Sequence, residues 1–158
     1  MAWNLGLLGA SLPVSAGAFD LLETVTLSTD TATVSFAGLA AYAADYKHLQ
    51  IRAVGQANLT SQGLHNLFIR LNSDTGSSYS YHQVYSDGVA AQAQGGGSSS
   101  FLLCRNPFGS KLDSGIFGST VIDFLDIHSS SKNTTMRAFG GATQPGEKSI
   151  SLDGGGWY

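Results

Sequence analysis

The chain has 158 residues, a formal net charge of −3 and only 12% charged residues, against about a quarter in a typical soluble domain. This length suits one domain, and the eight Lys and Arg residues are too few and too scattered for the basic stripe of a general nucleic-acid binder. Because Cys104 is the single cysteine, an intrachain disulfide and a cysteine metal cluster are excluded. The composition fits a β-rich protein that meets neighbours over much of its surface, and it fits an ordinary small β-sandwich equally well.

The first 20 residues read as an extended N-terminal arm. Residues 1–19 contain no charge and no clean hydrophobic period, so they should not fold alone. We expect the arm to lie along another subunit or along its own sandwich, and the alternative is a disordered tail. No basic start precedes the apolar stretch, which Pro13 interrupts, so we expect no secretory signal and a soluble protein made in the cytosol. The candidate assembly residues of the arm are Trp3, Leu5, Leu7, Leu8, Leu12 and Val14.

Strand-like sequence begins near Leu22. Residues 22–28 and 31–36 are rich in Thr and Val, and the intervening Thr29-Asp30 predicts a hairpin. The Ala-rich residues 39–46 are the only credible helix, of one or two turns, because they place two tyrosines four residues apart on one face.

Residues 46–88 contain three further strand-like runs. Apolar side chains alternate with polar ones at 49–53 and again at 67–71, and the third run is 79–85. The polar residues 72–78, with Gly76, predict a chain reversal between the second and third runs. We interpret the whole as an antiparallel meander.

Two sequence runs in this stretch are distinctive, namely YKHLQIR at 46–52 and FIRLNSDTGSSY at 68–79, followed by His82. Together they resemble a recurrent domain in structural proteins of tailed bacteriophages. The resemblance covers about residues 21–158, and the apolar leader is similar as well. It implies a virion component of the decoration, fibre or tail type. Such proteins usually continue past a Gly-Gly-x-Trp segment into another strand or two, so the resemblance implies that the domain is truncated after Tyr158 or lacks a C-terminal strand.

The second half alternates loops and strands. Residues 86–100 have no apolar side to bury and predict a mobile surface loop, and 101–105 predict a strand that ends at Asn106-Pro107. Residues 116–128 are apolar on both faces and predict a central strand that is buried on both sides, followed by short strands at 136–139 and 148–152. We therefore predict an all-β protein: an antiparallel β-sandwich of the jelly-roll type at 21–158, with the arm at 1–20 and at most one short helix. An immunoglobulin-like sandwich is the second choice.

Catalytic and metal-binding patterns are absent from the sequence. Asp123 and Asp126 would point to opposite faces of a strand, so they should pair with arginines rather than act together as acid and base. The run 72–76 lacks the further acidic ligands of a calcium loop. The four histidines are dispersed, and Cys104 reads as a buried inert thiol. We expect no enzyme, no catalytic residue, no metal and no cofactor.

Tyr79, Tyr81 and Tyr85 share one face of their strand. Facing inward they would be ordinary core, which we favour, and facing outward they could stack on sugar rings with Asn72 and Asp74 as polar partners.

The leading hypothesis is a non-enzymatic phage virion protein, most specifically a capsid decoration (cement) protein. It would dock on a major capsid or tail protein through its arm, form a homo-oligomer, with a trimer expected, and reside in the virion after assembly in the host cytoplasm. It would contact no nucleic acid and no membrane. The alternative is a tail- or fibre-associated module that binds host-surface carbohydrate.

Overall fold

The computed structural model describes residues 19–58, 63–110 and 115–158. The predicted assembly residues between Trp3 and Val14 lie outside the described residues. The chain divides into two units, one up to Ala37 and one from Gly38 to Tyr158. The second unit contains a short 3-10 helix, η1, and eight strands: η1 (Leu39–Tyr42), β1 (Leu49–Ala57), β2 (His65–Ile69), β3 (Tyr79–Ser86), β4 (Ala91–Ser99), β5 (Leu102–Ser110), β6 (Gly118–Leu125), β7 (Thr134–Gln144) and β8 (Glu147–Trp157).

This composition confirms the predicted all-β fold with at most one short helix. The strands form one curled sheet in the order β2-β5-β1-β6-β7-β8-β3-β4. All neighbouring pairs are antiparallel except β1 and β5, which run parallel over a short stretch where Gln56 lies opposite Gly109. The sheet is therefore mixed, whereas the sequence predicted an antiparallel one.

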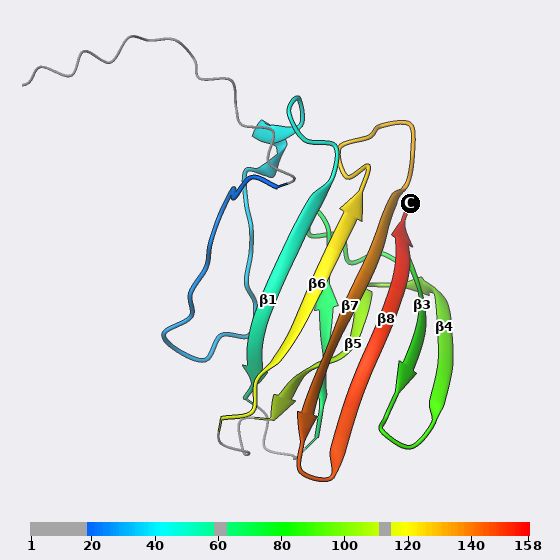
Figure 1. Cartoon of the computed structure of the whole chain (residues 1–158). Helices are drawn as coiled ribbons and strands as arrows, with labels where there is room; N and C mark the ends of the chain where they lie inside the picture. The colour runs from blue at the N-terminus through cyan, green and yellow to red at the C-terminus, as the bar shows by residue number, and fades with distance from the viewer. Residues whose placement is uncertain (1–18, 59–62, 111–114) are drawn as a thin grey trace, which may run out of the picture. The chain divides into compact units, whose positions relative to one another are not determined.

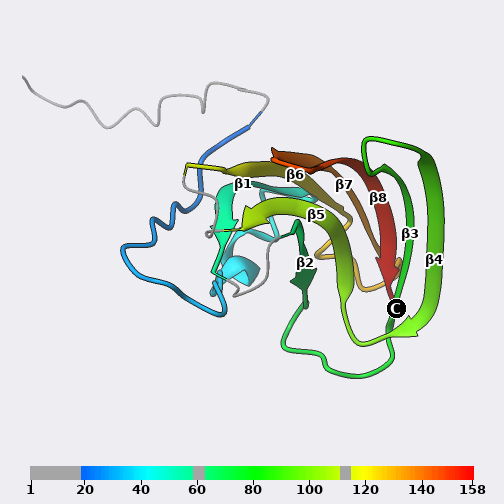
Figure 2. The same cartoon turned by 90° about the horizontal axis from the view of Figure 1, so that it is seen from below.

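The curl of the sheet produces two facing layers. Strands β1, β6, β7, β8, β3 and β4 form a curved sheet, and β5 crosses its concave side with β2 beside it (Figures 1 and 2). The core lies between these layers, where Leu102 and Cys104 of β5 meet Ile122 and Phe124 of β6 and Met136 of β7, all at most 2% exposed. We call the side of the curved sheet that faces β5 the inner face and the opposite side the outer face.

The three runs of residues 46–88 form the predicted strands β1, β2 and β3, but they do not form a meander. β1 pairs with β5 and β6, β2 pairs with β5, and β3 pairs with β4 and β8. The prediction was wrong because alternation identifies a strand and its buried side but not its partners. The connections between these strands lead from one layer to the other.

Residues 86–100 are not a loop, which corrects a second prediction. Ala91–Ser99 form β4, which pairs antiparallel with β3 from Ser86↔Ala91 to Tyr81↔Gly96. Such a strand needs no apolar side chains, because backbone hydrogen bonds hold it and most of its residues are exposed. The turn before it is built by Asp87, whose Oδ1 accepts the N–H groups of Val89 and Ala90, each at 3.0 Å.

β5 continues through the Asn106-Pro107 pair that was expected to end it. Asn106 has φ of +46°, and the register with β2 shifts between His65 and Leu67, so this pair lies in a bulge. The N–H of Asn106 donates to Oδ1 of Asn66 at 3.0 Å. A bulge tolerates proline because the bulged residue does not donate to the ladder.

The last two strands are longer than predicted. β7 and β8 join at Pro145-Gly146, where Gly146 has φ of +81°. Proline followed by a glycine with positive φ is the sequence of a type II turn, so the predicted 140–146 loop shrinks to a tight hairpin.

The predicted hairpin at 22–36 is also absent. Residues 19–37 contain no strand, and Leu21 and Leu27 are 83% and 51% exposed. Thr and Val favour strands only where a partner strand and a packing surface are present, and two strands alone are marginal. The predicted helix does form, as η1 and a following turn in which the Tyr42 and Tyr46 rings lie 6.3 Å apart. Within the described residues, no helix is long and apolar enough to span a membrane.

Candidate functional site: the outer face of the sheet

Two of the three tyrosines proposed as a sugar platform lie in the core. Tyr79 is fully buried, and its hydroxyl accepts the Leu71 N–H at 3.0 Å and donates to the Asp74 carbonyl at 3.1 Å. Burial raises the pKa of Tyr79. Tyr85 is 8% exposed and lies beneath the Arg105 guanidinium, 3.7 Å from its ring centre, while Tyr81 is half-buried. The core interpretation is confirmed for Tyr79 and Tyr85, which cannot offer their faces to a ligand.

Asn72 and Asp74 belong to a structural turn. Asn72 is exposed with φ of +52°, and Oδ1 of Asp74 accepts the Gly76 N–H at 2.7 Å. Oδ2 of Asp74 accepts the indole N–H of Trp157 at 2.8 Å. The Trp157 hydrogen bond, followed by that of Gly76, lowers the pKa of Asp74. These bonds tie the turn to the end of β8, as expected for a turn rather than a calcium loop.

The outer face carries a row of exposed apolar side chains, which was not foreseen. Cross-strand pairing aligns Val121 with Phe139, Phe139 with Leu152, and Leu152 with Val84. Their exposed fractions are 39%, 57%, 58% and 58% in that order. We call these four residues the outer row; it crosses β6, β7, β8 and β3, four consecutive strands of the sheet.

Further apolar residues extend the outer row along the strands. Val54 of β1, Phe117 before β6 and Ile150 of β8 are 77%, 61% and 52% exposed. With the outer row they place seven large apolar side chains on this face, and groups of exposed apolar side chains usually mark contact sites.

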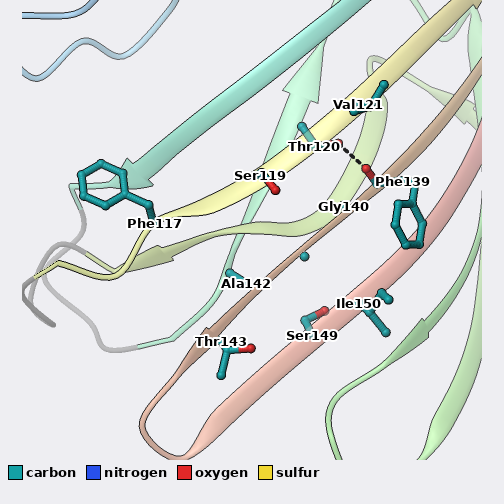
Figure 3. A pocket seen from close by; sticks show the side chains of 11 residues that line it. Phe117, Ser119, Thr120, Val121, Phe139, Gly140, Ala142, Thr143, Ser149 and Ile150 are labelled. Carbon is teal, nitrogen blue, oxygen red and sulfur yellow. Dashed lines mark hydrogen bonds between the residues drawn. The ribbon is translucent and has the colours of Figure 1, made fainter.

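A shallow depression lies within this surface between β6, β7 and β8. Phe117, Phe139 and Ile150 border it (Figure 3), and Gly141, two residues after the outward-facing Phe139, leaves its middle free of a large side chain. Gly141 is required by close backbone approach, because a Cβ there would clash with the Ser149 carbonyl oxygen.

A row of polar side chains runs beside the outer row on the same face of the sheet, on the side away from Ile150. Register places Gln50 opposite Asp123 and Asp123 opposite Arg137. Asp123 accepts from Nε2 of Gln50 at 2.7 Å and from Nε of Arg137 at 3.0 Å, and these bonds lower its pKa. The predicted carboxylate–arginine pairing is confirmed for Asp123. Asp126 instead follows β6, and its partner is Lys132 at 3.4 Å.

Among the described residues, the most enclosed carboxyl group lies on the inner face. Asp153 of β8 is 2% exposed and accepts three hydrogen bonds: from Nε2 of Gln83 at 2.9 Å, the Ser151 hydroxyl at 2.9 Å and the Arg105 backbone N–H at 3.2 Å. Burial outweighs these bonds and raises the pKa of Asp153. The hydrogen bonds of Asp153 thus connect β8 and β3 of the curved sheet with β5 of the second layer.

The remaining reactive side chains lie apart from one another. In the described part of the chain, no three His, Cys, Asp or Glu residues gather where they could hold a metal ion. His48 accepts the Asp126 N–H through Nδ1 at 3.0 Å. Cys104 is fully buried, and burial raises the pKa of its thiol, so it fits the predicted inert role.

Comparisons with protein families, with curated proteins and with solved structures find no match to this chain. The features of the molecule itself therefore carry the functional argument.

The outer row left a signal in the sequence that was misread. Residues 116–128 are apolar on both faces, and both faces were predicted to be buried. In the structure Thr120, Ile122 and Phe124 face inward, whereas Val121 is exposed on the other side. Strand periodicity shows that a second apolar face exists but not whether the same chain covers it.

Proposed function

We propose that this protein is a non-enzymatic structural component of a phage virion, and within that class a capsid decoration protein. The observation that carries the proposal is the outer row, a line of large apolar side chains that the described part of the chain leaves exposed. Burying apolar surface is worth about 25 cal/mol per Å², so covering this face with a protein neighbour would supply a substantial driving force for assembly. The phage assignment rests on the sequence resemblance, to which the outer row adds a physical reason for assembly.

The charged groups support a structural rather than a catalytic role. Asp123 and Arg137 pair across two strands, and Asp153 links the two layers. Each carboxyl group with a shifted pKa on these strands thus has partners in the same fold. A catalytic carboxyl group would instead face a cleft that a substrate can enter.

A cement role is favoured over a fibre or tail role because the strand-bearing unit is small and is preceded by an uncharged apolar leader. We propose that this leader docks on a capsid or tail protein while the outer face packs against a neighbour. The protein would then reside in the virion and assemble in the host cytoplasm.

Particle attachment tests the proposal. The double variant Phe139→Asp, Leu152→Asp should stay folded, because both side chains are more than half exposed, yet it should lose most of its occupancy on purified particles. Val89→Asp is the matched control, since Val89 is 95% exposed at the β3–β4 turn and outside the outer row. Equal occupancy of all three proteins would refute a role for this face.

The leader is tested separately. Deleting residues 1–18 should leave the fold intact, because the strands begin at Leu49, while occupancy falls sharply. Full occupancy of the deletion variant would place attachment on the β unit alone. Detection of the protein at only a few copies, confined to the tail, would refute the cement assignment.

A further inference from the structure

The curled sheet ends in two edge strands that differ in how well they are protected. β2 has five residues, and its pairing with β5 is interrupted by a bulge. β4 has nine residues and lies outermost beside β3 (Figure 1). An edge strand presents unpaired backbone N–H and C=O groups, and natural proteins usually protect long edges with charges, prolines or bulges.

The regular part of β4 has little of this protection. Ala91–Gly96 pair residue by residue with β3, and the bulge comes only afterwards, at Gly97-Ser98, where Ser98 has φ of +52°. The whole strand, AQAQGGGSS, contains no charged residue and no proline. Residues 91–95 are exposed. Six regularly paired residues therefore form an uncharged edge, and five of them are exposed.

We infer that β4 of one copy pairs antiparallel with β4 of a second copy about a two-fold axis perpendicular to the sheet, which gives a dimer in place of the trimer expected from the sequence. Such an axis places each residue opposite its own equivalent or a near neighbour, so a charged side chain on the strand would meet its like. β4 satisfies this requirement because it has no charge. Backbone pairing supplies the bonds, as in other cases of strand addition to an open edge.

The pleat restricts the register of this pairing. Directly opposed residues must point to the same face, so Ala91 and Ala93 can oppose only residues of their own face, and Gln92 and Gln94 only theirs. One residue of β4 must therefore lie directly opposite its own copy, and the axis passes midway between these two equivalent residues.

The pairing also extends the outer row. Ala93 lies opposite Val84, so it is the position at which the row reaches the edge of the sheet. A second copy joined at β4 has its outer face on the same side, and the two rows become one continuous apolar band. The inference rests on the proposed function only in that an assembly protein has a use for such a band.

The test uses the purified full chain, without particles. Sedimentation velocity should show a dimer, and Ala93→Lys should weaken it at least about tenfold because like charges meet across the axis. Val84→Lys is the matched control: it adds the same charge to the same row, one strand away from the edge. If both variants weaken the dimer equally, the contact is the outer face and the edge pairing is wrong.

Single cysteines locate the axis. Directly opposed Cβ atoms lie about 4.5 to 5.5 Å apart, so among Ala91→Cys, Gln92→Cys, Ala93→Cys and Gln94→Cys one position should form a disulfide dimer far faster than the others. The wild type is the background, because Cys104 is fully buried. A monomer, a trimer, or a dimer that none of the four cysteines crosslinks would overturn the inference. None of these results would bear on particle attachment, which is measured separately.

Discussion

The inner and outer faces of the curved sheet are built from the same strands, yet they contain opposite kinds of surface. On the inner face of β8, Asp153 is 2% exposed and fully engaged in hydrogen bonds. On the outer face of the same strand, the preceding residue Leu152 is 58% exposed. A carboxyl group is thus buried while a leucine is left in water.

This difference shows that, among the described residues, a second layer covers only one face of the curved sheet. The inner face has a second layer, and its polar groups are supplied with partners, as buried polar groups require. The outer face has no layer from the described part of the chain, although the outer row consists of large apolar side chains. Packing within the described residues therefore does not account for exposed residues such as Phe139.

The largest expected effect comes from a pair of phenylalanines. Phe124 is 2% exposed on the inner face and Phe139 is 57% exposed on the outer face. Phe124→Ala should lower the free energy of unfolding by about 3 to 5 kcal/mol because it leaves a cavity, and Phe139→Ala by less than about 1 kcal/mol. Urea unfolding of both variants measures the difference. Equal losses would mean that the outer face is also packed within one chain.

A pair of aspartates should show a smaller difference. Asp153→Ala removes the acceptor of two buried hydrogen bonds and one partly buried one and should cost about 2 to 3 kcal/mol. Asp123→Ala removes a partly exposed pair with Arg137 and should cost less than about 1 kcal/mol. Urea unfolding of both variants measures these losses. A larger loss for Asp123→Ala than for Asp153→Ala would contradict the prediction.

The two aspartates should also give opposite pH dependences. Burial raises the pKa of Asp153 above the ordinary value of 3.8, so its contribution to stability is full below that value and falls as the pH rises through the raised pKa. The Gln50 and Arg137 bonds lower the pKa of Asp123, so its contribution is present above 3.8 and is lost as the pH falls through the lowered pKa.

Unfolding free energies of Asp153→Asn and Asp123→Asn, measured over a pH series against the wild type, separate these signs. Above pH 3.8 the stability of the wild type should fall with rising pH because of Asp153, and Asp153→Asn should not show this fall. Below pH 3.8 the stability of the wild type should rise with pH because of Asp123, and Asp123→Asn should not show this rise. Slopes of the same sign would show that one of the two environments is misassigned.

The last comparison concerns the reactivity of thiols on the two faces, and it should involve the smallest change in stability. Cys104 of β5 is fully buried against the inner face, and burial raises its pKa, so a thiol reagent should reach it only through unfolding. Val84→Cys places a thiol on the outer face and should react about a thousandfold faster. Rapid labelling of Cys104 in folded protein would show that the second layer opens readily.

Local sequence determined the all-β class, most strand positions and the burial of Tyr79, because alternation and turn residues act over a few neighbours. It also determined the short helix at Leu39. The run at 116–128 showed two apolar faces, but the sequence wrongly predicted both to be buried.

Only the tertiary structure decided which strands pair. The placement of β1, β2 and β3 in separate parts of the sheet and the formation of β4 from a glycine-rich segment depend on backbone bonds between residues far apart in sequence. The outer row also depends on the tertiary structure. Val121, Phe139, Leu152 and Val84 come from four strands, and only their register across the sheet makes them one surface.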